Sequence, residues 1–361
     1  RRPTRGRHAR GGRVRRLARG HGRRAGLLAR DGPRSGEPRP DGALPLAGSA
    51  SVWWQGAFSG GRDHLAETLA VALDAATQRR LSGLRADIAG LSLDRPRIMG
   101  ILNITPDSFS DGGQIFAVED ALNRARKMAT EADILDIGGE STRPGSATVA
   151  EKDEIARVVP VIEAIRAAGI TTPISIDTRK ASVAAAALDA GADIVNDVAA
   201  MTYDSAMAGL VAERGVPVCL MHAQGDPATM QDDPRYDDVV LDVFDWLSER
   251  ISAAQSAGIA RDKIIVDPGI GFGKTLQHNV SLLQNLSIYH DLGFPILLGA
   301  SRKRFIGTIG NAPDPLDRVA GSVAVALHGA AQAVQILRVH DTFETRQALS
   351  LQQAIFGTDI S

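Results

Sequence analysis

Polar and charged residues stand at the ends of eight short aliphatic runs between residues 98 and 340. Acids and amides end the earlier runs, and bases end the last two. Grouped in one cavity, the acids and amides could hydrogen-bond a ligand, while the bases could bind an anion. In chain order these residues are Asn103, Asp136, Asp177, Asn196 with Asp197, His222, Asp267, Lys303, and Arg338 with His340.

Asp177, Asn196 and Asp267 end the third, fourth and sixth runs. Their side chains match the donor edge of a planar, amide-rich heterocycle such as a pterin or a purine. A single aspartate after a strand is more often a helix cap. Three that converge on one cavity favour binding, because buried acids require a ligand or a cation as partner.

The bases Arg302 and Lys303 follow the seventh run, and Arg338 and His340 lie two residues apart in the eighth. Two-residue spacing places both side chains on one face of a strand. Arginine offers a forked pair of donors to phosphate oxygens, and lysine offers a point charge. His340 alone would be interpreted as a core histidine, but together the four residues predict a phosphate site.

Three loops follow these runs. Residues 105–113 (TPDSFSDGG) and 138–145 (GGESTRPG) are polar and rich in glycine, and we expect both to move over the site rather than to be simple connections. The third, GIGFGK, lacks the spacing of a Walker motif because Pro268 occupies the required glycine position. We interpret it as a turn that lets a substrate approach Asp267 and Phe272.

The elements that must position these residues alternate along the chain. Continuous aliphatic runs are typical of strands buried on both faces of a parallel sheet. Between them lie helical patterns, and eight β/α units predict an α/β (β/α)8 TIM barrel, whose strand ends converge on one mouth. We expect the helices near 117–131, 151–168, 180–190, 204–214, 236–257, 276–292, 315–332 and 342–356.

Two sections precede the barrel domain of residues 96–357. Residues 1–42 contain 14 Arg, no Lys and 3 acids, a charge of 14 − 3 = +11, so the rest carries (41 − 14) − (42 − 3) = −12. We favour a disordered extension, or a misassigned upstream start, over an RNA-binding or targeting arm. Residues 43–95 are expected to be a small helical appendage, with a helix from Asp63 to about Gly90 and a packed Trp53–Trp54 pair.

Composition excludes several classes of protein. The acidic globular part argues against nucleic-acid binding. The single Cys219 excludes an internal disulfide, is expected to be a buried, inert thiol, and is typical of a reducing compartment, so we expect a cytoplasmic protein. No aliphatic stretch approaches the ~20 residues of a membrane span.

Over residues 97–357 the chain resembles the dihydropteroate synthases of folate biosynthesis. The resemblance rests on eight ordered motifs: ILNITPDSFSDGG, DIGGESTRPGS, SIDTRK, IVNDV, MHAQGDPATMQ, VDPGIGFGK, GASRKRFIG and RVHD. It implies a transferase that joins 6-hydroxymethyl-7,8-dihydropterin diphosphate to 4-aminobenzoate and releases pyrophosphate and 7,8-dihydropteroate. It also implies a homodimer, with an interface on helices far from the mouth.

The resemblance assigns roles to individual residues. Asn103 would contact Mg²⁺ bound to the diphosphate, and the catalytic set would be Asp111, Arg143, Lys303, Arg338 and His340. The pterin ring would lie against Asp177, Asn196, Asp267 and Lys303, with Met221 and Phe272 as neighbours. Thr142, Arg338 and His340 would bind the diphosphate. Phe109, Asp111, Arg143, Pro144, Ser301 and Arg302 would surround the aminobenzoate.

These residues suit an SN1-like reaction, in which the C–O bond breaks early and the amine attacks afterwards. Three alternatives stay open: a pterin-binding methyltransferase domain, a catalytically silent homologue, and an RNA-associated protein. A methyltransferase domain would not need the two loops or the SRK and RVH motifs. A catalytically silent homologue would have lost part of the loops or one of the charged residues. The third rests only on the Arg-rich extension. Sulfonamide sensitivity is left open by the sequence.

Overall fold

The computed structural model describes residues 28–29, 42–49, 51–54, 56–61, 64–69, 72–104, 113–141, 148–225 and 229–355. Its centre is an eight-stranded parallel sheet in the order β11-β10-β9-β8-β7-β6-β13-β12. A parallel bridge between Val266 and Ile296 joins the two outermost strands, so the sheet closes into a barrel. The predicted (β/α)8 fold is confirmed. The strands are β6 (Arg97–Asn103), β7 (Ile134–Gly138), β8 (Ile174–Asp177), β9 (Ile194–Asp197), β10 (Val218–Met221), β11 (Ile264–Asp267), β12 (Leu297–Leu298) and β13 (Ile336–Val339).

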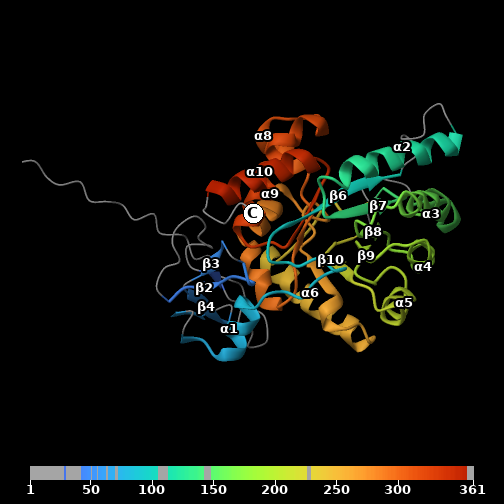
Figure 1. Cartoon of the computed structure of the whole chain (residues 1–361). Coiled ribbons are helices and arrows are strands. Elements are labelled where there is room, and N and C mark those ends of the chain that lie inside the picture. Colours follow the sequence, from blue (N-terminus) through green and yellow to red (C-terminus); the bar gives the residue numbers. More distant parts are fainter. Residues whose placement is uncertain are drawn as a thin grey trace, which may run out of the picture.

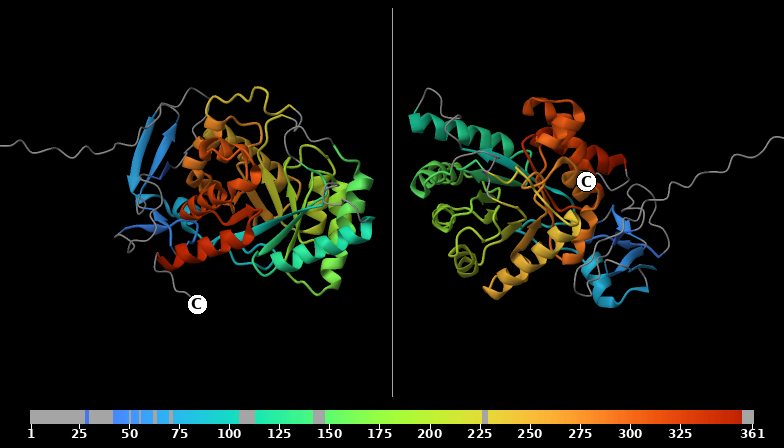
Figure 2. Two further views of the ribbon diagram at one scale, coloured as in Figure 1. Left: turned by 90° about the horizontal axis from the view of Figure 1, so that it is seen from above. Right: turned by 180° about the vertical axis from the view of Figure 1, so that it is seen from behind.

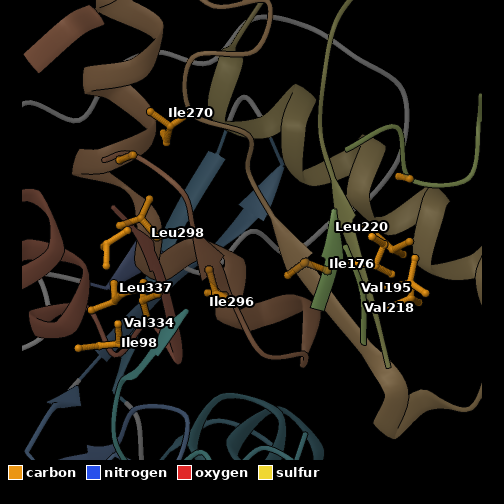
Figure 3. Close-up of a cluster of buried hydrophobic side chains, with 14 of the residues drawn as sticks. Ile98, Ile176, Val195, Val218, Leu220, Ile270, Ile296, Leu298, Val334 and Leu337 are labelled. Carbon is orange, nitrogen blue, oxygen red and sulfur yellow. The ribbon is translucent and has the colours of Figure 1, made fainter. Parts of the chain in front are cut away.

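Strand residues alternate between the barrel interior and the surrounding helices. Side chains such as Val195, Leu220 and Leu337 point outward and join the large apolar layer between strands and helices (Figure 3). The alternate residues form a separate apolar cluster low in the barrel: Met99, Ile134, Ile194, Cys219, Ile265, Leu297 and Ile336. Because the period is two, the next inward residue on a strand lies above that cluster, and on several strands it is polar. The alternation of side chains along each strand therefore places the polar residues at the mouth of the barrel.

Helices surround the barrel (Figures 1 and 2). Most predicted helix positions agree with the structure to within a few residues, and α6 begins where the Asp238 carboxylate caps it. The helix predicted over 276–292 is α-helical only to Gln284, and a 3-10 helix follows it. One helix was missed, the short α8 that begins directly after Lys303. The helices are α2 (Gly113–Met128), α3 (Glu151–Ala167), α4 (Ala181–Asp189), α5 (Met207–Arg214), α6 (Val239–Ser256), α7 (Leu276–Gln284), α8 (Arg304–Gly310), α9 (Val319–Ala331) and α10 (Thr342–Ile355), with 3-10 turns η3 (Arg261–Lys263), η4 (Leu286–Leu292) and η5 (Pro315–Arg318).

The section before the barrel consists largely of β-strands. The prediction of a helix from Asp63 to about Gly90 was wrong over most of that range. Among the described residues of that range only α1 (Ala75–Ser82) is an α-helix, and its N-cap is Asp74. Residues 64–69 form a strand instead, because an adjacent segment pairs with all six of them, a partner that local spacing does not reveal. The strands are β1 (Leu28–Ala29), β2 (Leu44–Pro45), β3 (Trp53–Trp54), β4 (Gly56–Gly61) and β5 (His64–Leu69).

These N-terminal elements lie on the side of the barrel away from α2–α5 (Figures 1 and 2). The Trp53 and Trp54 side chains are buried, in agreement with the predicted packing role. Arg80 of α1 is paired with Asp291 of η4 at 2.7 Å. Of the predicted extension 1–42, β1 pairs with β4, and nearly all the rest lies outside the described residues. The domain boundaries at 42 and 95 remain predictions.

Residues 88–93 close the lower end of the barrel. Ile88 and Leu91 form a small antiparallel bridge, and Ile88 and Leu93 pack into the inner apolar cluster. Cys219 belongs to the same cluster and is fully buried, which confirms the predicted burial of this thiol. The described residues therefore fill the base of the barrel with apolar side chains and leave the polar ones at the mouth.

Candidate active site

Arg338 occupies the centre of the mouth, where two buried carboxylates hold it. Its Nε donates to Asp136 Oδ2 at 2.6 Å, and its NH2 donates to Asp177 Oδ2, also at 2.6 Å. Asp136 is fully buried and Asp177 is 5% exposed. Three strands, β7, β8 and β13, thus meet through one guanidinium. The two acids fix the position and orientation of its positive charge.

The acidic side of the mouth has unused hydrogen-bonding capacity. The Asn196 amide lies 3.4 Å from Asp136 Oδ1, a long contact. The second oxygen of Asp177, Oδ1, is buried and accepts no hydrogen bond from any described residue. Burial raises the pKa of Asp177 to about 7; Arg338 opposes this shift and Asp136 adds to it. A buried acceptor without a donor is costly, so this oxygen is available to accept a hydrogen bond from a ligand.

Lys303 and Asp267 form the next part of the wall. Asp267 is 4% exposed and accepts a hydrogen bond from the Gly269 amide at 2.7 Å. The Lys303 ammonium donates to the Ile270 carbonyl and lies 4.3 Å from the centre of the Phe272 ring. Burial lowers the pKa of Lys303 to about 7, although Asp267 opposes the shift. The cation is thus placed beside an aromatic face and at the edge of the acidic side.

The glycine-rich turn after β11 is shaped by protein contacts. Gly269 has φ +68°, and a Cβ there would lie 1.8 Å from the His222 carbonyl oxygen. Gly271 has φ +85°, and a Cβ there would lie 2.9 Å from Cδ of Lys303. We predicted that this turn lets a substrate approach. The structure shows that both glycines are required because neighbouring protein atoms occupy that space.

His340 and Ser301 are in contact above Arg338. The Ser301 hydroxyl accepts from the His340 amide at 3.2 Å and lies 3.1 Å from Nδ1 of its ring. The guanidinium of Arg302 is instead bound to both carboxylate oxygens of Asp341, and its backbone adopts φ +57°. The positive charge of Arg302 is therefore paired with Asp341. Its predicted contact with a substrate would require this ion pair to break.

Asn103 and Met221 complete the described part of the site. Asn103 ends β6 opposite Gly138, and a Cβ at Gly138 would lie 3.6 Å from Asn103 Oδ1 and 3.7 Å from Asp177 Oδ2. Asp177 Oδ2 is already bound to Arg338, so Asn103 Oδ1 is the oxygen of this pair that suits a hard cation. Met221 is 3% exposed and pairs with Asp267 across β10 and β11.

Five predicted site residues lie outside the described residues, and their positions are not described. The structure brings the other eleven to one end of the barrel. The five are Phe109, Asp111, Thr142, Arg143 and Pro144.

Asp136 lies at the centre of the mouth, bound to Arg338, and the sequence analysis gave it no role. Its signal was present, since a charged residue between Leu135 and Ile137 in a strand must face a polar interior or be paired. His222 was named at the end of the fifth run but was given no role, and Lys274 was missed. Lys274 is 3% exposed, and its Nζ donates to His222 Nδ1 at 2.9 Å and to the Phe272 carbonyl at 2.9 Å. This pair supports the turn that carries Phe272.

Comparison with known proteins agrees with this geometry. The sequence model of the pterin binding enzyme family matches residues 99–340. The chain is 46% identical to the dihydropteroate synthase of Escherichia coli K12 over 272 residues, which covers 75% of this chain and 95% of that protein. Among solved structures, Xanthomonas albilineans dihydropteroate synthase with 4-aminobenzoic acid superposes with a TM-score of 0.71 and 48% identity, covering 76% of this chain and 99% of that one. The same enzyme in complex with 7,8-dihydropteroate gives a TM-score of 0.68 and 46% identity, covering 76% and 100%.

Proposed function

Because the chain belongs to the dihydropteroate synthases, a family of pterin-binding transferases, we propose that it joins 6-hydroxymethyl-7,8-dihydropterin diphosphate to 4-aminobenzoate. The products are 7,8-dihydropteroate and pyrophosphate. The observation that carries the proposal is the acidic wall of Asp177, Asn196 and Asp267 beside Arg338 and Lys303.

The pterin ring supplies the donors that this wall lacks. Ring N–H groups would satisfy Asp177 Oδ1, which has no donor among the described residues. Asn196 can donate and accept hydrogen bonds. Asp267 presents a second carboxylate on β11, two strands from Asn196 on β9. Phe272 and Met221 would pack against the ring faces. A ligand of this shape would turn the cost of the unpaired Asp177 Oδ1 into binding free energy.

The diphosphate lies on the basic side. Arg338 is held by two carboxylates, so its remaining N–H groups keep a fixed orientation toward an anion. His340, oriented by Ser301, and Thr142 would bind the outer oxygens. An anion near Lys303 would raise the pKa of that lysine from about 7 and favour its charged form.

Asn103 is the residue that would hold Mg²⁺, together with diphosphate oxygens. No group of three or more His, Cys, Asp or Glu suited to a metal occurs among the described residues, so the substrate itself would contribute ligands. When bound, the cation would neutralise negative charge on the leaving group.

The chemistry that this arrangement suits is early C–O cleavage. The bond between the pterin CH2 carbon and the bridging oxygen breaks, and its electron pair leaves with pyrophosphate. The positive charge on the dihydropterin is stabilised by Asp177 and Asp267. The amine lone pair of 4-aminobenzoate then forms the N–C bond, and the nitrogen loses a proton. Arg338 and His340 stabilise the charge that develops on the leaving oxygens.

The aminobenzoate would bind above the pterin. Ser301 lies beside His340, on the outer side of Arg338. Phe109, Asp111, Arg143 and Pro144 complete our proposed pocket, with Arg143 binding the carboxylate of the substrate. Arg302 would contribute only after releasing Asp341.

Pyrophosphate release by the full chain tests the function directly. We expect release that requires Mg²⁺, with dihydropteroate formed only when aminobenzoate is also present. Slow release without aminobenzoate supports early C–O cleavage. Tight pterin binding without turnover would contradict the synthase and favour a silent homologue.

We further propose a homodimer in a reducing compartment, the cytoplasm. Apolar side chains more than half exposed occur on α8, η5 and α10: Ile309, Leu316, Phe343, Leu351 and Ile355. α8 begins next to Lys303, so an interface that includes α8 would lie closer to the mouth than the one expected from the resemblance. Light scattering that gives one chain per particle would contradict the dimer. No helix among the described residues is both long and apolar enough to span a membrane.

A further inference from the structure

A buried cluster of four charges lies beside the mouth, outside the residues discussed so far. It consists of Glu140, after β7, Glu154 of α3, and Arg179 and Lys180, between β8 and α4. Each side chain is less than a tenth exposed. The cluster is neutral if all four groups are charged. Burying it is costly, and well-packed apolar residues of similar volume would stabilise the fold as well or better. Its geometry therefore requires another explanation.

Lys180 is the centre of the cluster. Its ammonium donates to Glu140 Oε2 at 2.5 Å, to Glu154 Oε2 at 2.6 Å and to the Val149 carbonyl at 2.7 Å. Burial lowers the pKa of Lys180, but the bonds to Glu140 and Glu154 outweigh that effect and raise it above its ordinary value. Glu140 follows β7, whereas Val149 and Glu154 stand at the start of α3, so one ammonium joins these two parts of the chain.

Glu140 extends the connection. Its Oε2 also accepts from the Val149 amide at 2.9 Å, and its Oε1 accepts from Arg179 NH2 at 3.1 Å. Arg179 lies 4.0 Å from the centre of the Tyr203 ring and 3.4 Å from the Thr148 hydroxyl. Residues 140 and 148–149 stand on either side of segment 142–147. The cluster thus binds the point where the chain leaves β7 and the point where it returns to α3.

We propose that Lys180 is a positioning residue for the second substrate. By tying Glu140 to Val149, it sets the two anchor points of the segment that contains Thr142, Arg143 and Pro144. This inference rests on the proposed function, which assigns the aminobenzoate contacts of Arg143 and Pro144. Lys180 touches no substrate and acts only through these anchors.

The test variant is Lys180→Met combined with Glu154→Gln. Removing one base and one acid keeps the cluster neutral, because Glu140 retains Arg179. The bond to the Val149 carbonyl is lost. The matched control is Arg166→Met, which removes a guanidinium bound to Asp193 at 2.6 Å and to the Gly191, Ile170 and Thr172 carbonyls. Arg166 connects the same helix, α3, to the opposite end of the barrel.

We expect the KM for 4-aminobenzoate to rise at least tenfold in the double variant, while the KM for the pterin diphosphate changes less than threefold. Arg166→Met should lower the melting temperature and leave both KM values within twofold. A folded double variant whose KM for aminobenzoate is unchanged, or whose two KM values rise equally, overturns the inference. Activity of the unaltered chain is measured first, because its absence would refute the proposed function and not the role of Lys180.

Discussion

Replacing Arg338 by methionine isolates the charge at the centre of the site. The Arg338→Met variant leaves Asp136 and Asp177 adjacent, buried and without their shared cation. Removing one partner of a buried ion pair typically costs about 3–5 kcal/mol. At about 2–4 °C per kcal/mol, the melting temperature should fall by about 6–20 °C.

The loss of stability in Arg338→Met should depend on pH. The direction of that dependence follows from the pKa of the buried carboxylates. In the intact protein, burial raises the pKa of Asp177 to about 7 and Arg338 opposes that rise. Without Arg338 the folded-state pKa rises further, while the unfolded chain keeps the ordinary value of about 3.9. The folded variant then holds protons that the unfolded chain has released, so its stability falls as pH rises. The difference from the intact protein should be small at pH 5 and largest above pH 7.

Urea unfolding at pH 5 and pH 8 measures this difference. Adding Asp136→Asn to Arg338→Met should recover about 1–3 kcal/mol at pH 8, because only one unpaired carboxylate then remains. Arg346→Met is the control: its partner Asp133 keeps Arg95 at 3.2 Å, so the loss should be smaller. Equal losses at both pH values, or no recovery in the double variant, would refute the reasoning.

Further predictions concern the ligands. Asp267→Asn should lower kcat/KM for the pterin diphosphate roughly 10- to 150-fold, because a hydrogen bond to a charged group contributes about 1.5–3 kcal/mol. Steady-state kinetics at saturating aminobenzoate measure this change. An unchanged kcat/KM would show that Asp267 does not contact the substrate. Asn103→Ala should raise the Mg²⁺ concentration for half-maximal pyrophosphate release roughly 10- to 100-fold, a shift read from Mg²⁺ titrations after chelation. At pH 8, binding of inorganic pyrophosphate should take up protons, because the anion raises the pKa of Lys303 from about 7. Calorimetry in two buffers of different ionisation enthalpy detects this uptake, which Lys303→Met should abolish.

Most of the strand-end residues could be predicted because their signal is local. An aliphatic run identifies a strand buried on both faces, and alternation with period two then places Asp177, Asn196 and Asp267 on the inner face. The barrel follows from eight such runs separated by helices. The same reasoning failed for residues 64–69, where pairing with Gly56–Gly61 overrides a helical spacing of leucines. Sheet pairing depends on a partner that the local pattern does not contain.

Which charged groups pair with one another was decided only by the folded chain. Arg338 and Asp136 are separated by 202 positions, and Lys180 and Glu140 by 40. No spacing rule connects them, because their contact depends on how the strands are staggered around the closed barrel. For the same reason the sequence could not show that Arg302 is bound to Asp341 or that Asp136 lies at the centre of the mouth. The sequence alone was sufficient for the kind of side chain at each strand end and the face on which it lies. Closure of the barrel selected the partners, since ion pairs and hydrogen bonds form only between groups that the tertiary structure brings within about 3 Å.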